Sequence, residues 1–451
     1  MMGFLKMFYP GLGIKRWLIL AVIGLVLVSV GASIMGNTSV LGHMEANIMS
    51  FIINLFGSNW FLGGAVVFIL GILLLVVGFK QLIGSFINAV FPEFARSQVR
   101  PVYQEFILSR GPRIVVLGGG TGLSVLLRGL KEYTNNITAI VSVADDGGSS
   151  GRLRDQLGIL PPGDVRNCIV ALADKEALME KLFNYRFHQG EELAGHNLGN
   201  LFLAAMWDMY GNFEEAIGKM SKVLAIRGKV IPATLENVIL KAELSDGSIV
   251  TGESNISKTS LPIKRVSIDP EQAEPLAEAL DALQEADAII LGPGSLYTSI
   301  IPNLLISKIT EAIKTSPALK IYVCNIMTQP GETDGYTAAD HLQSIYEHSS
   351  PGLVDYILVN EQPILNQDII RKYAAEGAQR VVVDGERLRK MGVKILSKSL
   401  LEEKELVRHN SQKLAQSIIE LIIKQKTGFK RYNFIDRFIL LEKYKGKERG
   451  N

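Results

Sequence analysis

Two long apolar segments occupy the first 80 residues of the chain. Residues 17–36 and residues 60–79 contain no charged side chain. A helix of about 20 apolar residues spans the roughly 30 Å hydrocarbon core of a bilayer. A cleaved signal peptide is the alternative for the first segment, but its apolar part exceeds the usual length and a second segment follows it. The pattern therefore predicts a transmembrane hairpin in residues 1–83.

Charges that flank the two segments predict the topology. Lys15 and Arg16 precede the first segment, Lys80 and Arg96 follow the second, and residues 37–59 contain no lysine or arginine. Positively charged flanks remain on the cytoplasmic side of a membrane. We therefore expect a protein held at the cell membrane by two spans, with both termini and everything after residue 80 in the cytoplasm.

Two further segments are expected to lie near the membrane. Residues 84–110 form a connector, and residues 81–94 resemble an interfacial helix that ends at Pro92, although an ordinary helical linker explains them almost as well. Residues 426–451 form a tail that is rich in basic and aromatic side chains. Such a tail suits an anionic membrane surface, and a solvated extension or a subunit contact is the equal alternative.

Short Val- and Ile-rich runs alternate with helical patterns in residues 111–425. Continuous apolar runs of this length indicate strands buried on both faces, as in a parallel sheet between helices. We expect strands in RIVVLGGG, ITAIVSV, ADAIIL, LKIYVCNI, DYILVN and RVVVD. The predicted fold is a doubly wound, Rossmann-like α/β domain whose ligand binds at the carboxyl ends of the strands. Residues 229–269 instead alternate polar and apolar positions around an Asp246-Gly247 turn, which predicts a small antiparallel insertion.

Charge and cysteine content argue against a nucleic-acid partner and against a disulfide framework. The net charge of +2 gives no sign of the basic surface that a nucleic-acid-binding domain carries, so we expect no nucleic-acid partner. Cys168 and Cys324 lie far apart in apolar stretches. That placement is typical of buried thiols in a reducing compartment rather than of a disulfide or a metal site.

A glycine-rich loop follows the first expected strand and opens a helix. Glycines allow the backbone to approach an anion, and the helix N-terminus supplies free N–H groups. The loop does not match the dinucleotide fingerprint G-x-G-x-x-G, because Leu123 occupies the third glycine position, and it lacks the Lys-Ser/Thr ending of a P-loop. A tight turn without a ligand is the alternative. The candidate anion-binding residues are Gly118, Gly119, Gly120, Thr121 and Gly122.

The loop after the second expected strand carries two carboxylates and begins a basic helix. Asp145 and Asp146 can accept hydrogen bonds from ribose hydroxyls or hold a divalent cation, and Arg152 can pair with a phosphate. A plain acidic turn is the alternative. In a doubly wound sheet this loop lies beside the glycine-rich loop. Further candidate ligand-binding residues in this region are Ser149, Ser150 and Asn167.

Two later motifs add polar groups to the expected site. In GHNLGN, His196 and Asn200 are four residues apart and would share a helix face, and Asn197 adds a polar group with no use in a core. We favour ligand contact over a capping or core role for them. A second glycine loop follows ADAIIL, where Tyr297 offers a ring to stack on a base. The candidate residues of that loop are Gly292, Gly294, Ser295, Tyr297 and Thr298.

Six ordered motifs give the sequence a family resemblance: VVLGGGTGLSVLLRGL, VADDGGSSGRLR, PPGDVRN, GHNLGNLFLAAM, ILGPGSLYTS and NIMTQPGETDGYT. Together they resemble the bacterial gluconeogenesis-factor proteins of the YvcK type, within the CofD-like (2-phospho-L-lactate transferase) superfamily, over residues 111–425. The resemblance implies a regulator, rather than a proven enzyme, that binds UDP-N-acetylglucosamine or a related nucleotide sugar. It also implies a role in balancing carbon flux, including gluconeogenesis, against cell-envelope synthesis and cell shape.

The resemblance further implies which cofactors and partners to expect. No cofactor is required for a regulator, whereas the transferase relatives use a divalent metal held by aspartates. Mg²⁺ is therefore expected only if the transferase hypothesis holds, with Asp145, Asp146 and Asp164 at the matching positions. Besides the nucleotide sugar and the membrane, the expected partners are an envelope-synthesis protein and a second copy of the chain in a homodimer.

Three hypotheses follow for the function. In the first, the loops at the strand ends bind a nucleotide sugar and the bound state changes an interaction with an envelope-synthesis enzyme. The second is a metal-dependent transferase that uses a nucleotide-activated donor. The third, a purely structural membrane adaptor, is disfavoured by the density of polar glycine loops. We favour the regulator.

Overall fold

The computed structural model describes residues 14–36, 60–90, 105, 108–174, 176–403 and 406–425. The chain divides into two units, Met1–Glu105 and Phe106–Asn451. The predicted loop at residues 37–59, the end of the connector helix beyond residue 90 and the basic tail after residue 425 lie outside the described residues. Each unit is considered separately below.

The N-terminal unit contains a pair of apolar helices. Helix α2 spans Ile14–Gly36 and helix α4 spans Trp60–Val90. Both are long and apolar enough to cross a membrane. Because α4 is continuous to Val90, the interfacial helix expected at residues 81–94 is, as far as residue 90, an extension of this span rather than a separate element.

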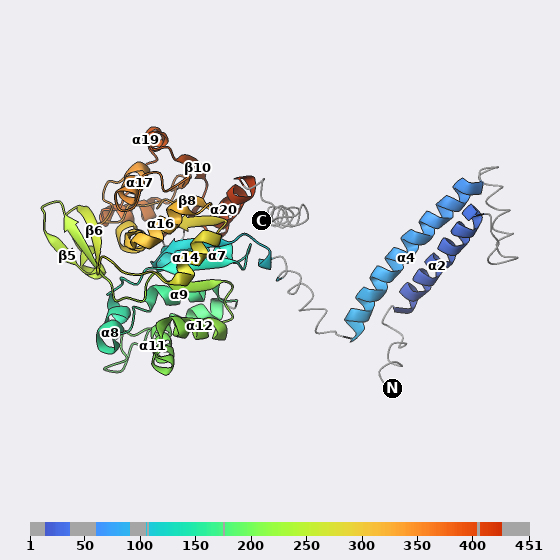
Figure 1. Ribbon diagram of the computed structural model, residues 1–451, viewed down its shortest axis with the longest axis horizontal. Coiled ribbons are helices and arrows are strands. Elements are labelled where there is room, and N and C mark those ends of the chain that lie inside the picture. The colour runs from blue at the N-terminus through green and yellow to red at the C-terminus, as the bar shows by residue number, and fades with distance from the viewer. Residues whose placement is uncertain are drawn as a thin grey trace. The chain divides into compact units, whose positions relative to one another are not determined.

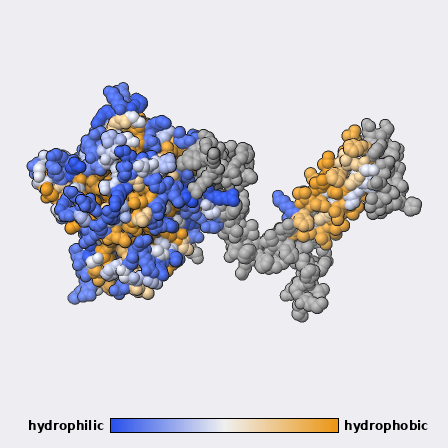
Figure 2. Space-filling view, viewed as in Figure 1, coloured by the Kyte–Doolittle hydropathy of each residue, from blue (hydrophilic) through white to orange (hydrophobic). Residues whose placement is uncertain are grey.

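The helix pair is apolar on its outside and glycine-rich on its inside. Leu18, Ile19, Leu62 and Ile69 expose about half of their surface or more, and Figure 2 shows a continuous hydrophobic surface on the two helices. Aliphatic side chains that face outward in this way suit a lipid environment.

Glycines bring the two helix backbones together. An ideal Cβ on Gly31 would lie 2.5 Å from the Phe68 nitrogen, and one on Gly71 would lie 2.5 Å from the Val28 nitrogen. Small residues at helix contacts are characteristic of membrane proteins, where helices associate through close packing instead of hydrophobic burial.

The second unit is built on a sheet of seven parallel strands, in the order β10-β9-β8-β7-β1-β2-β3. The central strands consist of Val, Ile and Leu residues that are buried on both faces, as parallel strands between helices require. The strands are β1 (Ile114–Gly118), β2 (Ile137–Val141), β3 (Lys229–Pro232), β7 (Ala288–Leu291), β8 (Leu319–Val323), β9 (Tyr356–Asn360) and β10 (Lys394–Lys398).

Helices connect the strands of this sheet and confirm the predicted doubly wound α/β class (Figure 1). They are α7 (Gly120–Leu130), α8 (Gly148–Leu157), α9 (Gly163–Leu172), α10 (Glu176–Phe183), α11 (Leu198–Tyr210), α12 (Phe213–Val223), α13 (Glu253–Ile256), α14 (Ala277–Glu285), the π-helix η2 (Leu296–Ile300), α15 (Ile301–Leu305), α16 (Ser307–Thr315), α17 (Ala338–Glu347), α18 (Gln367–Ala375), α19 (Gly385–Lys390) and α20 (Ser411–Gln425).

Two small antiparallel sheets complete the unit. In the first, β4 (Ile239–Leu244) pairs with β5 (Ile249–Thr251) and with β6 (Ile263–Asp269). This sheet is the predicted insertion, and in Figure 1 it projects from one end of the unit. In the second, β11 (Leu401–Glu403) pairs with β12 (Val407–His409).

Two sequence predictions about strands were wrong. Residues 229–232 were assigned to the insertion, but they form β3, which pairs in parallel with β2 at the edge of the main sheet. The RVVVD segment forms only isolated bridges, and Val382 is exposed. The strand at this edge of the sheet is instead β10. Its residues are exposed or half-buried, and its sequence KILSK contains no continuous apolar run that could have predicted a strand.

The glycine contacts of the hairpin can be tested with Gly71→Leu. The new side chain would meet the backbone of α2, so we expect the helices to separate. The measurement is disulfide cross-linking between cysteines introduced at Val30 and Val67, which pack together. Cross-linking should fall several-fold, while Ile69→Val on the exposed face should leave it unchanged. Undiminished cross-linking in Gly71→Leu would show that the glycine does not determine the helix distance.

Candidate functional site

The topology of the sheet marks one place as a ligand site. Strands β1 and β7 are neighbours, and the chain proceeds outward from β1 through β2 to β3 and, in the opposite direction, from β7 through β8 and β9 to β10. In open α/β sheets, ligands bind at the carboxyl ends of the strands where the direction of winding reverses. The loops that follow β1 and β7 are therefore the expected walls of a site.

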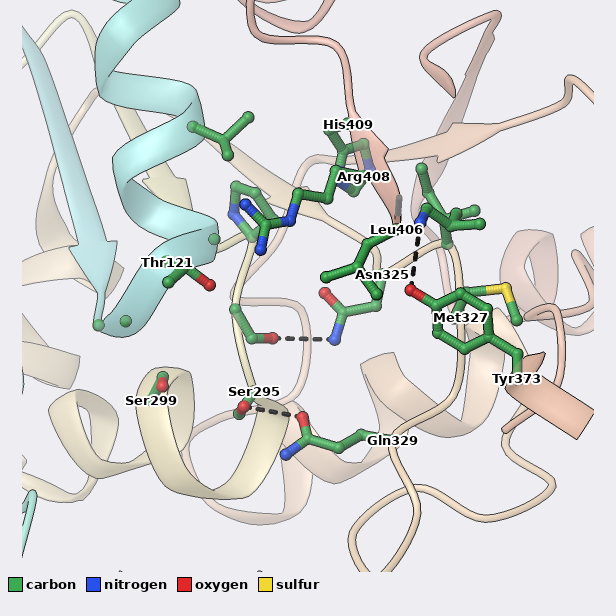
Figure 3. A pocket seen from close by; sticks show the side chains of 18 residues that line it. Thr121, Ser295, Ser299, Asn325, Met327, Gln329, Tyr373, Leu406, Arg408 and His409 are labelled. Atoms are coloured by element: carbon green, nitrogen blue, oxygen red, sulfur yellow. Dashed lines mark hydrogen bonds between the residues drawn. The ribbon is translucent and has the colours of Figure 1, made fainter. Parts of the chain in front are cut away.

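A cavity of about 320 Å³ lies between these loops. The residues that line it include 119–122 after β1, 293–295 after β7 and 325–327 after β8. The lining also includes Tyr373 of α18 and Arg408 of β12 (Figure 3). We call this cavity the crevice.

The floor of the crevice is glycine backbone in close contact with its neighbours. An ideal Cβ on Gly122 would lie 2.6 Å from the Pro293 carbonyl oxygen, and one on Gly119 would lie 2.4 Å from Oδ2 of Asp164. Neither position has room for a side chain. Gly119 is also the N-cap of α7 and offers no side-chain cap. The Gly120 N–H is hydrogen-bonded to the Asp164 carboxyl group, which leaves the other N–H groups of the first turn for an anion.

The structure adds Asn325, Gln329, Tyr373 and Arg408 to the predicted crevice residues. The Asn325 amide donates to the Gly294 carbonyl oxygen over 2.9 Å, and the Ser295 hydroxyl donates to Oε1 of Gln329 over 2.7 Å. Arg408 is exposed on β12. Asn325 lies two residues after the end of β8 and begins the motif NIMTQPGETDGYT, so its position near a strand end was a usable signal. Tyr373 and Arg408 belong to no glycine loop and carried none.

His196 and the two asparagines of the GHNLGN motif assemble around one hydroxyl. Ser149 Oγ accepts from Asn197 N and from Asn200 Nδ2, so its own proton is available to His196 Nδ1, 3.1 Å away. His196 is therefore the tautomer protonated at Nε2. Helix α11 begins only at Leu198 and Asn197 is its N-cap, so the expectation that His196 shares a helix face with Asn200 was wrong.

Carboxyl groups gather beside the crevice. Burial and the nearby Asp145 raise the pKa of Asp164 to about 7. Burial, with contributions from Asp145 and Asp164, raises the pKa of Glu253 to about 9. A neutral carboxyl group at pH 7 is therefore expected at Glu253, because each additional negative charge here is opposed by desolvation and by its neighbours.

The structure does not bring the three predicted metal aspartates together as one ligand set. Asp145 accepts a hydrogen bond from Gly147 N, and Asp146 accepts one from Ser254 N at the start of α13. Within the described residues, no group of three His, Cys, Asp or Glu side chains is arranged to hold a metal ion. No chemical step is therefore assigned to a metal.

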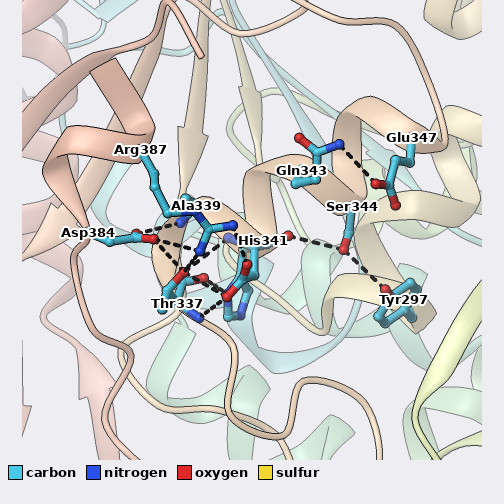
Figure 4. A network of polar contacts seen from close by, with 10 residues as sticks. Tyr297, Thr337, Ala339, His341, Gln343, Ser344, Glu347, Asp384 and Arg387 are labelled. Carbon is cyan, nitrogen blue, oxygen red and sulfur yellow. Dashed lines mark hydrogen bonds and ion pairs between the residues drawn. The ribbon is translucent and has the colours of Figure 1, made fainter. Parts of the chain in front are cut away.

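Two residues of the second glycine loop have structural contacts in place of the expected ligand contacts. Tyr297 is 2% exposed, and its hydroxyl lies 2.9 Å from that of Tyr336 and 3.1 Å from that of Ser344 (Figure 4). Its ring is packed in the core and presents no face to a base. Thr298 is buried and donates to Glu332. Their side chains point to the interior because η2 turns them away from the crevice.

The remaining predicted residues divide between the crevice and the region of the Ser149 hydroxyl. Thr121, Gly120, Gly294 and Ser295 line the crevice. Ser150 and Arg152 lie on α8 instead: a Cβ on Gly163 would meet Ser150 Oγ, and Arg152 donates to the Ala194 carbonyl oxygen. The following residues complete the predicted set: Gly118 ends β1, Gly292 follows β7 and Asn167 lies on α9, where it accepts from Arg166.

This fold and crevice define a doubly wound α/β protein with a ligand site at its switch point. The model of the 2-phospho-L-lactate transferase CofD family matches residues 114–401. The chain belongs to this CofD-like family, and its similar relatives within it are gluconeogenesis factors.

Relatives differ in how much of the chain they match. The gluconeogenesis factor of Halalkalibacterium halodurans is 56% identical over 68% of this chain and 95% of its own. A crystal structure of a UPF0052-family protein from Bacillus halodurans superposes with a TM-score of 0.66 at 54% identity, covering 68% of this chain and 99% of that one. A provisionally named gluconeogenesis factor of Clostridium acetobutylicum is 43% identical over 98% of this chain and 97% of its own. That last match includes the segment with the two apolar helices.

The carboxyl cluster makes stability depend on pH. Glu253 loses its proton near pH 4.5 when unfolded but only near pH 9 when folded, so its contribution makes the free energy of unfolding fall as pH rises between these values. At pH 8 we expect Glu253→Gln to be more stable than the wild type by several kcal/mol, roughly 1.4 kcal/mol for each pH unit above 4.5, and the difference should vanish below pH 4.5. Urea denaturation at several pH values is the measurement, with the exposed Glu192→Gln as control. A constant difference at all pH values would contradict the assignment.

Proposed function

We propose that this chain is a membrane-anchored regulator that binds UDP-N-acetylglucosamine or a related nucleotide sugar in the crevice and links carbon metabolism to cell-envelope synthesis. The observation that most strongly supports this proposal is the crevice at the switch point of the sheet, whose floor consists of glycine backbone. Membership of the gluconeogenesis-factor group supports the metabolic side of the proposal.

The floor of the crevice suits a diphosphate. The bare backbone around Gly119 and Gly122 permits close approach, and the start of α7 provides N–H donors and a partial positive charge. Arg408 is a cation on the crevice lining without an ion pair to any described residue. A guanidinium pairs with phosphate in a bidentate manner, so Arg408 is the residue that neutralises the diphosphate.

The walls of the crevice suit a nucleoside and a sugar. Asn325 and Gln329 present amide groups that can read the edge of a base or the hydroxyls of a sugar. Tyr373 supplies an aromatic wall, and its hydroxyl accepts from Val407 N, which connects α18 to β12. This ring takes the stacking role that the sequence had assigned to Tyr297.

The apolar helix pair supplies the membrane attachment. Outward-facing aliphatic residues on α2 and α4 require a lipid environment, and the basic residues before and after the helices favour a cytoplasmic location for the rest of the chain. A tethered domain of this kind is close to enzymes that use lipid-linked envelope precursors. We infer that its partner is such an envelope-synthesis protein, with a homodimer as a second form of association.

The nucleotide-sugar proposal is tested by Arg408→Gln. Loss of one charge-assisted pair costs about 1.5 to 3 kcal/mol, so affinity for UDP-N-acetylglucosamine should fall by roughly ten- to a hundredfold. Calorimetric titration measures it, with UDP, GDP and NAD as comparison ligands. Arg380→Gln is the matched control, because Arg380 donates to the Glu361 carbonyl oxygen outside the crevice lining. Equal affinity in Arg408→Gln and the wild type would place the ligand elsewhere.

A metal-dependent transferase is the second candidate, favoured by the carboxyl cluster beside the crevice. In a regulator held by backbone N–H groups and Arg408, adding a chelator should change nucleotide-sugar affinity by less than about threefold, well under 1 kcal/mol. Gly119→Ala should instead abolish binding, because its Cβ would displace Asp164 at the crevice floor. Calorimetry with and without chelator checks both expectations. Binding that collapses on chelation would promote the transferase to first place.

A further inference from the structure

Three arginines lie close together, and none of them forms an ion pair with a carboxylate of a described residue. Arg152 donates to the Ala194 carbonyl oxygen, Arg166 to Asn167 Oδ1 over 2.6 Å, and Arg186 to the Gly195 carbonyl oxygen over 2.6 Å. All of these acceptors are neutral. Within the described residues, none of the three comes within 4.0 Å of an acidic oxygen. We call Arg152, Arg166 and Arg186 the arginine cluster.

The cluster is mutually repulsive. Arg186 opposes the positive charge of Arg166, whereas the nearby Asp164 and Asp145 favour it. Burial first, and then Arg152 and Arg186, lower the pKa of His196. Cations this close together, with no carboxylate in ion-pair contact, indicate that a bound anion neutralises their charge.

Arg166 is the strongest single indication of a ligand. Its side chain is 8% exposed, yet Nε and Nη1 have no hydrogen-bond partner. Leaving a buried charged donor unsatisfied is costly, and such groups in a native structure require an explanation. An ideal Cβ on Gly199 would lie 2.6 Å from Cδ of Arg166, and the next residue, Asn200, has an unsatisfied Oδ1 as well. The pair offers a donor fork for an anion and an acceptor for a hydroxyl.

Helix N-termini meet at the same place. Ser149 in the first turn of α8 binds Asn197 N and Asn200 at the start of α11. A Cβ on Gly163, the first residue of α9, would lie 2.5 Å from Ser150 Oγ of α8. The partial positive charges of α8, α9 and α11 therefore add to the charge of the cluster.

We propose that the arginine cluster is a second ligand site, separate from the crevice, that binds the phosphate group of a small phosphorylated metabolite. The unsatisfied Nε and Nη1 of Arg166 form a planar donor fork that matches two oxygens of a phosphate group. The guanidinium of Arg166 contacts the phosphate through Nε and Nη1, and Asn200 Oδ1 accepts a hydroxyl of the ligand. The site does not depend on what binds in the crevice.

The test is calorimetric titration of the full chain, in nanodiscs of zwitterionic lipid, with inorganic phosphate and with glycerol 3-phosphate. Arg166→Lys keeps the charge but removes the fork, and affinity for both probes should fall about tenfold or more. Arg380→Gln is the matched control, since Arg380 donates to the Glu361 carbonyl oxygen and lines neither the crevice nor the cluster, and it should bind phosphate as the wild type does. Absence of saturable phosphate binding, or equal binding by Arg166→Lys, would overturn the proposal. So would loss of phosphate binding in Arg408→Gln, which would place the phosphate in the crevice.

Two further measurements keep the proposal testable if Arg166→Lys does not fold. Arg186 is exposed, so Arg186→Gln should fold, and it should bind phosphate several-fold more weakly. An anion in the cluster should also raise the pKa of His196, because it offsets the charges of Arg152 and Arg186. NMR titration of the His196 ring with and without phosphate measures this rise. No change in His196 together with unaltered binding by Arg186→Gln would contradict the site.

Discussion

The contact between the loops after β1 and β7 is the constraint on which the rest of the soluble unit depends. With 2.6 Å between an ideal Cβ of Gly122 and the Pro293 carbonyl oxygen, the two backbones leave no space for a side chain. The strands that these loops follow are neighbours at the switch point of the sheet. Close approach of the loops therefore creates a floor made of peptide groups. An anion on this floor would be bound by peptide N–H groups rather than by side chains.

A buried carboxyl group connects this floor to the rest of the domain. Glu332 accepts hydrogen bonds from Tyr297 N, Thr298 Oγ1 and Gln329 Nε2, and burial raises its pKa to about 7. The Tyr297 hydroxyl continues the chain of contacts to Ser344 on α17 (Figure 4). From there, His348 accepts from Val266 N of the small sheet. The loop after β7 is thus held by polar contacts from both α17 and β8, which explains why Tyr297 packs inward.

The sequence could predict the fold class and the position of the site because both follow from local patterns. Continuous apolar strands and the glycine loop at Gly119 reveal parallel strands and their carboxyl ends. The direction of a side chain does not follow from such local patterns. Whether Tyr297 faces the crevice or the core depends on the π-helical turn of η2. Tyr373 and Arg408 reach the crevice only through the tertiary packing of α18 and β12, so no spacing along the chain could reveal them.

Glycine has a different structural role in each of the two units. In the hairpin, Gly31 and Gly71 let two helices touch, because lipid provides no hydrophobic drive for association and close packing must supply the attraction. In the second unit, Gly119 and Gly122 lie at the end of a sheet that hydrophobic burial assembles, and their small size lets the loops after β1 and β7 approach each other. Glycine at those positions weakens the local chain by conformational entropy. Glycine is nevertheless required at Gly122, because any side chain there would collide with the Pro293 carbonyl oxygen of the facing loop; the glycines of the hairpin thus bring two helices together and those of the crevice bring two loops together.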